Sequence, residues 1–376
     1  MSSIIVIGAG MVGGAMAIDL AKKHSVTLAD VNIRRTKQIQ KKCPDITAME
    51  LDVLDAASFQ SALKPFDLVV CAVPGFLGYH TIKQIINAGK NAVDISFFPE
   101  NGLDLDESAK AKGVTVFVDC GVAPGMDNII LGHYNEMFEL TDFECLVGGL
   151  PKVKKWPFYY KAPFSPIDVI EEYTRPARYV ENGKIIVRDA LSDCELIEFD
   201  NVGTLESFNT DGLRSIIYTM PHIKNMKEKT LRYPGHVEIV KALKESGFFS
   251  KKKVNVQGQS VSPLEVTSKI LFDEWKLGET EPEMTVMRIT LKGKNKSGQT
   301  EEVVYNLYNE YSSETQTSSM ARTTGYTATA IANMFLDGLF TQQGVFPPEM
   351  IGKRTACYEY IIQYLKERNI HYIKKT

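Results

Sequence analysis

The stretch IIVIGAGMVGGAMA at residues 4–17 constrains the fold more than any other part of the chain. Residues 3–7 form a short apolar run rich in β-branched side chains, which is typical of a buried parallel strand. Gly8, Gly10 and Gly13 follow with the spacing GxGxxG, and the residues after them carry apolar side chains at helical intervals. A strand, a glycine turn and a helix in this order predict the start of a dinucleotide-binding Rossmann domain.

Each glycine of this motif has its own role. Gly8 allows the tight turn, Gly10 lets a pyrophosphate approach the backbone, and Gly13 lets the helix pack closely against the strand. The helix that begins here offers free N–H groups and a partial positive charge to the phosphates. We therefore expect Met11 and Val12, at the start of this helix, to contact the cofactor as well.

The second strand, SVTLAD at residues 25–30, ends in Asp30, at about the distance from the glycines that the fingerprint requires. An acid here accepts hydrogen bonds from the ribose hydroxyls of an adenosine and repels a 2′-phosphate, so Asp30 favours NAD. The alternative is that Asp30 only caps the following helix. Asn32, Arg34 and Arg35 leave NADP open, because an arginine beside this acid can accommodate the extra phosphate.

Strands and helices continue to alternate up to Gly121. Further strands are predicted within residues 46–55, ending at Asp52, and within 66–75, 89–96 and 113–121; helical stretches are predicted at 36–42, 56–64, 79–89 and 105–113. This alternation predicts an α/β fold with a doubly wound parallel sheet, which binds ligands at the carboxyl ends of its strands. Additional cofactor contacts are expected at those ends, from Val31, Asn32, Asp52, Val53, Ala72, Val73 and Pro74.

The pattern changes after Gly121. A proline-led helix at 123–138 is followed by strand candidates at 143–152, 183–191, 196–201, 285–293 and 303–309, and the last two flank a hairpin loop containing Gly298. Helical patterns return at 325–339 and 355–369. The sequence therefore predicts an NAD(P)-binding Rossmann domain at 1–125 and a substrate domain with a mixed or antiparallel sheet at 126–318. The segment 319–376 is expected to pack its helices back on the first domain.

Composition excludes several classes of protein. The formal net charge of −3 gives no sign of a nucleic-acid partner or of an anionic membrane surface. No run approaches the roughly 18 apolar residues of a membrane span, and the N-terminus does not resemble a signal peptide, so we expect a cytoplasmic protein. The six cysteines form no CxxC pair and the six histidines are scattered, which argues against a disulfide framework and a metal site.

Several longer motifs resemble the saccharopine dehydrogenase family. They are PGFLGYHTIK, VDISFFPEN, VDCGVAPGMDNI, VGGLPK, YYKAPFSPIDVIEEYTRPAR, FNTDGLRS, TLRYPGHVE and MARTTGYTA. The closest resemblance is to the compact branch of lysine 6-dehydrogenase and saccharopine dehydrogenase-like proteins. This resemblance implies NAD(P)-dependent oxidation of a C–N bond, in which lysine gives 2-aminoadipate semialdehyde and ammonia. Alternatives are oxidation of saccharopine to the same semialdehyde and glutamate, and a reductive reaction of the carboxynorspermidine type.

Three residues are candidates for proton transfer. The family motif implies that Lys83 lies near the active site, although it can equally be a surface lysine of an amphipathic helix. Asp119 ends the sixth predicted strand and is a candidate general base or partner of Lys83; the alternative is a cap for the next helix. Asp94 ends the fifth strand, and the direction of its side chain is left open because a one-residue shift reverses it.

The substrate carboxylates require cationic or hydrogen-bonding partners. Arg232 and Arg214 are the preferred clamps, because a guanidinium binds a carboxylate with two hydrogen bonds. His236 is a candidate for substrate binding or proton transfer, and otherwise a structural histidine. Asn209 and Tyr160 complete the predicted substrate site. Other residues of these motifs keep two interpretations each: Asp211 is an ammonium partner or a turn residue, and Arg175 and Arg178 bind substrate or pair with Glu171 and Glu172.

Two further expectations concern partners and class. Apolar strands in the second domain indicate a homodimer or homotetramer, with a small amino-acid substrate. A different class of protein, a nucleotide sensor without catalysis, would keep the Rossmann motif but lack the chemistry of Lys83, Asp119 and Arg232. Those three residues are present at their motif positions, which favours an enzyme.

Overall fold

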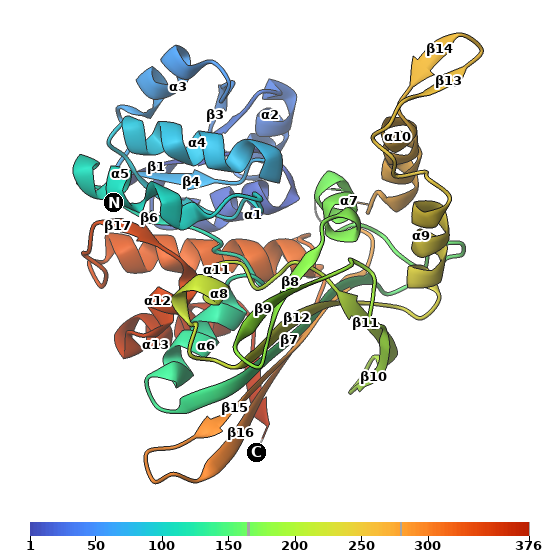
Figure 1. Ribbon diagram of the computed structural model, residues 1–376. Helices are drawn as coiled ribbons and strands as arrows, with labels where there is room; N and C mark the ends of the chain where they lie inside the picture. The colour runs from blue at the N-terminus through green and yellow to red at the C-terminus, as the bar shows by residue number, and fades with distance from the viewer. Residues whose placement is uncertain (164–165, 279, 376) are drawn as a thin grey trace.

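The computed structural model describes residues 1–163, 166–278 and 280–375. Most strands of the described residues belong to two large sheets, and the long helix α11 (Ser319–Leu336) runs between them (Figure 1). An arm made of helices α9 (His236–Glu245) and α10 (Pro263–Trp275) and a small hairpin, β13 (Val254–Val256) with β14 (Gln259–Val261), projects from one side (Figure 1).

The first sheet has seven parallel strands in the order β17-β6-β5-β4-β1-β2-β3. The strands are β1 (Ser3–Ile7), β2 (Ser25–Asp30), β3 (Thr47–Glu50), β4 (Leu68–Cys71), β5 (Asn91–Asp94), β6 (Thr115–Phe117) and β17 (Gly344–Phe346). The predicted doubly wound sheet is confirmed, with strands shorter than expected. The seventh strand, from the C-terminal part of the chain, was not predicted.

The helices of the first domain alternate with these strands. They are α1 (Met11–Ala21), α2 (Ile33–Lys42), α3 (Ala56–Leu63), α4 (Gly75–Asn87), the 3₁₀ turn η1 (Gly102–Leu105) and α5 (Asp106–Lys112). β1, β4, β5 and β6 are almost fully buried on both faces, which is why they read as continuous apolar runs, whereas β3 is partly exposed. This arrangement places the ends of β1, β4, β5 and β6 on one edge, the carboxyl edge of the sheet.

The second sheet is mixed, as predicted. Its main path is β10-β11-β12-β7-β15-β16-β18, and β8 pairs with β12 and with β9. The strands are β7 (Glu139–Pro151), β8 (Ala177–Glu181), β9 (Lys184–Arg188), β10 (Glu195–Phe199), β11 (Gly203–Asn209), β12 (Asn225–Arg232), β15 (Glu283–Lys294), β16 (Thr300–Glu310) and β18 (Tyr372–Lys375). β8, β11, β12 and β18 were not predicted. The expected hairpin of β15 and β16 is present, with Gly298 in its loop.

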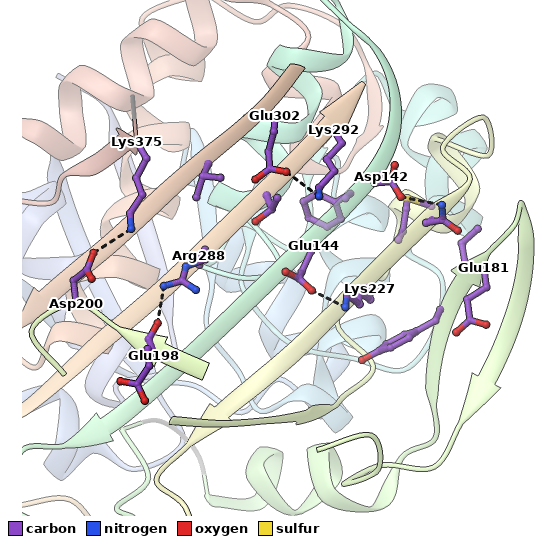
Figure 2. A pocket seen from close by; sticks show the side chains of 17 residues that line it. Asp142, Glu144, Glu181, Glu198, Asp200, Lys227, Arg288, Lys292, Glu302 and Lys375 are labelled. Atoms are coloured by element: carbon purple, nitrogen blue, oxygen red, sulfur yellow. Dashed lines mark hydrogen bonds and ion pairs between the residues drawn. The ribbon is translucent and has the colours of Figure 1, made fainter. Parts of the chain in front are cut away.

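The two faces of this sheet differ in chemistry. On β15, Met287, Ile289 and Leu291 point into the core, and the alternating residues Arg288 and Lys292 point away from it. The outer face forms a hollow of about 740 Å³ lined by charged side chains (Figure 2). Those charges largely pair with one another, as in Lys227–Glu144 at 2.7 Å, Lys292–Glu302 at 2.8 Å and Lys375–Asp200 at 3.1 Å. The paired charges allow this outer face of the sheet to remain in contact with water.

The C-terminal helices return to the first domain, as predicted. Asp19 of α1 is the anchor: its carboxylate accepts hydrogen bonds from Thr329 of α11 at 2.7 Å and from Tyr364 of α13 (Thr355–Lys366) at 2.7 Å. Arg368 adds an ion pair to the same carboxylate at 2.9 Å. The segment also joins the second sheet, because β18 pairs with β16.

Four helices complete the chain around the junction of the two sheets. They are α6 (Met126–Asn135), which is the proline-led helix of the sequence, α7 (Pro166–Thr174), α8 (Ile216–Thr219) and α12 (Pro348–Gly352). α7 contains part of the motif YYKAPFSPIDVIEEYTRPAR, of which residues 164 and 165 lie outside the described residues. Within the described part of the chain, no helix is both long enough and apolar enough to cross a bilayer.

Candidate active site

Two of the three motif glycines are required by the packing of the protein itself. Gly8 has a left-handed φ of 101°, and a Cβ at this position would lie 2.4 Å from the carbonyl oxygen of Ala72. A Cβ on Gly13 would lie 1.9 Å from the carbonyl oxygen of Gly8. The first turn of α1 therefore packs directly on the glycine loop and on the end of β4.

Gly10 has no such internal reason. A Cβ built on it would meet no atom within 4 Å, and the residue is exposed. Gly10 is also the N-cap of α1, so no side-chain cap satisfies the first N–H groups of the helix. An open approach to an uncapped helix N-terminus fits a pyrophosphate group of a dinucleotide.

Asp30 has a role that the sequence did not indicate. Its Oδ2 accepts a hydrogen bond from the backbone N–H of Ala9 at 2.7 Å, and its Oδ1 accepts one from Asn32 at 2.8 Å. The cap of α2 is Asn32, whose side chain accepts from the N–H of Arg34, so the alternative of Asp30 as a helix cap is wrong. Asp30, at the end of β2, therefore stabilises the conformation of the glycine loop through its hydrogen bond with Ala9.

The other predicted cofactor residues lie along the carboxyl edge, with different exposures. Met11, Val31, Asn32, Asp52 and Pro74 are exposed, Val12 and Ala72 are half-buried, and Val53 and Val73 are buried. Asp52 lies beyond the end of β3, and its carboxylate accepts from the N–H of Leu54 at 2.9 Å. The exposed apolar side chains beside polar groups suit the faces and edges of a nucleotide.

Asp119 forms a buried ion pair with Arg214 at the junction of the two sheets. The Nη2 of Arg214 lies 3.0 Å from Oδ1 of Asp119, and Nη1 donates to the carbonyl oxygen of Phe98. A small cavity of about 20 Å³ lies beside this pair. Asp119 has φ 56° and Arg214 has φ 52°, a left-handed conformation that is unfavourable for residues other than glycine. Such strained backbones concentrate at functional sites.

Two expectations for Asp119 are not met. The N-terminus of α6 is held by Asp127, whose carboxylate accepts from the N–H of Gly125 at 2.9 Å, so Asp119 is not its cap. Lys83 lies on the exposed face of α4 and is not the partner of Asp119. The ion-pair partner of Asp119 is Arg214. The exposure of Lys83 fits the alternative of a surface lysine.

Asp94 is completely buried and faces α4. Its carboxylate accepts hydrogen bonds from the N–H of Ser96 at 3.1 Å and from its hydroxyl at 2.6 Å. A Cβ on Gly78 of α4 would lie 2.3 Å from that hydroxyl oxygen, which places the pair between the sheet and the helix. Burial raises the pKa of Asp94 to about 7. The value suits proton transfer near neutral pH, whereas the position is that of a structural group.

Arg232 lies in a buried aromatic cluster and is already held by the protein. Its Nη2 lies 3.3 Å from a carboxylate oxygen of Glu172 and 3.3 Å from the hydroxyl of Tyr160, and its Nε donates to Tyr173 at 3.0 Å. The ring of Tyr160 lies 4.3 Å from the guanidinium carbon. Burial raises the pKa of Glu172 to about 7. Tyr160 and Arg232 therefore come together as predicted, with Glu172 as their internal partner.

His236 is bonded at both ring nitrogens. Nδ1 lies 2.8 Å from the carbonyl oxygen of Phe158, and Nε2 lies 2.9 Å from the hydroxyl of Tyr173. Because a carbonyl only accepts, Nδ1 carries the hydrogen, so Nε2 accepts from Tyr173, whose oxygen in turn accepts from Arg232. Burial lowers the pKa of His236 to about 3, so the imidazole is neutral. This environment fits the structural alternative for His236.

Asn209 and Asp211 are also engaged within the protein. Asn209 accepts from the hydroxyl of Tyr179 at 2.8 Å and donates to Asp193 at 2.8 Å. Asp211 holds Arg178 through two hydrogen bonds of 2.9 Å. The alternative that these arginines pair with Glu171 and Glu172 therefore does not hold for Arg178, whereas Arg175 does pair with Glu171, at 3.7 Å.

Phe97 is a junction residue that was not singled out from the sequence. The guanidinium carbons of Arg175 and Arg214 each lie 4.9 Å from its ring centroid. The signal for it was the aromatic pair of the motif VDISFFPEN, directly after a buried strand. Among the described residues, no group of three or more His, Cys, Asp or Glu side chains is placed to hold a metal ion.

Two family models match the chain. Residues 4–117 match the saccharopine dehydrogenase NADP binding domain, and residues 121–370 match the saccharopine dehydrogenase C-terminal domain. The boundary between them lies at the end of β6, beside Asp119. The NADP alternative that Arg34 and Arg35 left open agrees with the description of the first model, and either NAD or NADP is consistent with the glycine loop.

Individual proteins show the same relationship. The NADP(+)-dependent, L-glutamate-forming saccharopine dehydrogenase of Schizosaccharomyces pombe is 24% identical over 73% of this chain, and the chain spans 65% of its length. Carboxyaminopropylagmatine dehydrogenase of a Synechocystis strain is 23% identical, with 93% of this chain and 92% of that protein covered. The apo structure of the Saccharomyces cerevisiae L-Glu-forming saccharopine dehydrogenase superposes with a TM-score of 0.79 at 21% identity, covering 100% of this chain and 99% of that chain. With both of its main parts matched, the chain belongs to the saccharopine dehydrogenase family.

Proposed function

We propose that this protein is an NAD(P)-dependent dehydrogenase that oxidises the C–N bond of an amino acid carrying a second amine, with lysine as its first candidate substrate. The observation that carries the proposal is the position of the Asp119–Arg214 pair. It lies at the carboxyl edge of the same sheet whose glycine loop leaves Gly10 open for a pyrophosphate. Ligands of open α/β sheets bind at this edge.

Two parts of the chain have different roles in the proposed reaction, one in binding the cofactor and one in binding the substrate amine. The glycine loop and the N-terminus of α1 would hold the phosphates, and a bound nicotinamide would accept a hydride from the carbon next to the nitrogen. Both short contacts of Arg214 use Oδ1 of Asp119, so Oδ2 has no hydrogen bond to any described residue. This oxygen is the group that we assign to the substrate amine, as an ion-pair partner or as the acceptor of its proton.

A reductive carboxynorspermidine-type reaction is the second candidate. The relative named carboxyaminopropylagmatine dehydrogenase matches this chain over more than nine tenths of both lengths, whereas the fission yeast saccharopine dehydrogenase is considerably longer than the matched part. The agreement with this relative over nearly the whole of both chains is what supports the second candidate.

The test is cofactor reduction by the purified protein, followed at its near-ultraviolet absorbance. Lysine and saccharopine are compared with NAD and with NADP, and the reverse reaction is run with 2-aminoadipate semialdehyde and ammonium. Turnover of lysine with release of ammonia supports the first candidate, and turnover of saccharopine with release of glutamate replaces it. Cofactor binding with no turnover of any amine in either direction, the amines of the reductive candidate included, would instead support a nucleotide sensor.

A further inference from the structure

Arg175 differs from the other arginines at the junction because its charge is poorly matched. Its Nη1 is buried and has no hydrogen bond to any described residue, and its ion pair with Glu171 is long at 3.7 Å. By contrast, Arg178, Arg214 and Arg232 hold carboxylates at 2.9, 3.0 and 3.3 Å. A buried donor without an acceptor destabilises the folded protein, so a ligand that supplies the acceptor would relieve this cost.

The position of Arg175 is that of a ligand-binding residue. It follows α7, and its guanidinium carbon lies 4.9 Å from the ring of Phe97, three residues past the end of β5. The first turn of α7 reaches the same edge of the sheet, where Asp168 accepts from the N–H of Gly75 at 3.4 Å. α7 therefore lies across the carboxyl edge of the first sheet, and Arg175 stands at its far end.

The local charge also favours an anion. The guanidinium carbon of Arg214 also lies 4.9 Å from the ring centroid of Phe97, so the guanidiniums of Arg175 and Arg214 both contact the same ring. Burial and the neighbouring Arg214 lower the pKa of Arg175. Asp119 and Asp211 are bound by Arg214 and Arg178, and Glu171 is half exposed to water. Of the carboxylates around these three guanidiniums, Asp211 and Asp119 are each held by another arginine, which leaves Arg175 only its long pair with Glu171 among the described residues.

We propose that Arg175 binds a carboxylate of the amine substrate, and that this residue, rather than Arg232 or Arg214, is the principal carboxylate clamp. The inference rests on the proposed function and assigns the ligand class of its site. The side chain as a whole is 15% exposed, so an incoming carboxylate can reach the guanidinium, whose Nη1 has no acceptor among the described residues. Arg214 and Arg232 instead stabilise the structure around the site, because each is paired with an acid of the protein, Asp119 and Glu172 respectively.

The experiment measures equilibrium binding by calorimetry on the NADPH-loaded protein, with lysine, saccharopine and glutamate as probes. The variants are Arg175→Met and Arg175→Lys, with Arg188→Met as the matched control, since Arg188 is half-exposed and pairs only with surface acids. At least one probe is expected to bind the wild type and the control equally and to bind Arg175→Met at least tenfold more weakly. The lysine variant, which keeps the charge, should lie between them.

A second comparison identifies the group that Arg175 recognises. For a probe with one carboxylate, such as lysine, the corresponding amide lysinamide keeps the amine and removes the charge. Arg175→Met should abolish the preference for lysine over lysinamide while leaving the affinity for NADPH unchanged. An unchanged preference, or wild-type protein that binds none of the probes, overturns the inference. If binding weakens as expected but no probe reduces NAD or NADP when the protein is supplied with the oxidised cofactor, the carboxylate site stands and the proposed dehydrogenase function fails.

Discussion

Arg214 donates two hydrogen bonds to a single oxygen of Asp119, from Nε at 3.2 Å and from Nη2 at 3.0 Å. The two side chains are only 3% and 6% exposed, and they come from different halves of the molecule. Asp119 follows β6 of the parallel sheet, and Arg214 lies between β11 and α8 of the second domain. One buried ion pair therefore joins the two domains at the proposed site.

Asp119→Asn should destabilise the protein strongly. The substitution leaves the guanidinium of Arg214 buried without its counter-charge, for which the expected loss is about 3–5 kcal/mol of unfolding free energy. The matched control is Glu302→Gln, which breaks a pair with Lys292 in which both side chains are 51% exposed. That change should cost about 0–1 kcal/mol. The unfolding free energy of both variants is measured by denaturant titration. Equal decreases in the two variants would show that the buried pair contributes no more to stability than the exposed one.

Replacing the motif glycines one at a time should separate packing from ligand binding. Gly13→Ala places a Cβ 1.9 Å from a backbone carbonyl oxygen, so it should unfold or strongly destabilise the first domain. Gly10→Ala meets open space, and the stability without cofactor should change by no more than about 0.5 kcal/mol. Its NADPH affinity, measured by fluorescence titration, should fall about tenfold or more, which corresponds to about 1.4 kcal/mol. Unchanged affinity in Gly10→Ala would contradict pyrophosphate binding at this turn.

The parts of the fold that the sequence predicted are those with local signals. The parallel sheet follows from short apolar runs ending in Gly8, Asp30 and Asp94, because a strand buried on both faces has no polar alternation. Strand β17 was missed because three residues, Gly344–Phe346, are too short for a periodic signal. β8, β11 and β12 were missed because their alternating, partly charged sequences resemble loops as much as strands.

The site was predicted less completely because its pairings join distant parts of the chain. Arg214 and Asp119 are 95 residues apart, and no local pattern relates them. Asn209 and His236 looked available from the sequence, yet each is surrounded by internal partners that only the tertiary structure brings near. The glycine loop, whose partners lie mostly in one strand–turn–helix unit, was the part of the site that sequence reasoning placed best.

Glu349 should make the stability of the protein depend on pH. It is fully buried beside Asp127, accepts from Thr219 at 2.6 Å and from Ser215 at 3.1 Å, and burial raises its pKa from 4.5 to about 7. Between these two values the unfolded chain releases a proton that the folded protein keeps. The unfolding free energy should therefore fall as the pH rises from about 4.5 to 7 and should not change further above 7 through this group.

Glu349→Gln removes this titration and is the test of it. Over the same pH range the variant should lose less unfolding free energy than the wild type, by up to about 3 kcal/mol, since one pKa unit is about 1.4 kcal/mol. The neighbouring Asp127 should also ionise more readily in the variant, which acts in the same direction. Glu302→Gln, on the surface, should leave the pH profile unchanged. A variant profile parallel to that of the wild type would contradict the assignment.

Tyr173→Phe tests the hydrogen-bond chain in the aromatic cluster. The hydroxyl donates to Nε2 of the neutral His236 at 2.9 Å and accepts from Nε of Arg232 at 3.0 Å, so its removal leaves two buried groups without partners. A loss of about 1–3 kcal/mol in unfolding free energy is expected for each unsatisfied group. Tyr160→Phe is the control, because its hydroxyl makes one longer contact, 3.3 Å, with an Arg232 nitrogen that also holds Glu172. If His236 instead served as a free proton carrier, Tyr173→Phe would leave stability near that of the control and would change only the pH dependence of turnover. The larger loss for Tyr173→Phe, with NADPH affinity unchanged, would identify the chain from Phe158 through His236 and Tyr173 to Arg232 as the internal support of the substrate domain.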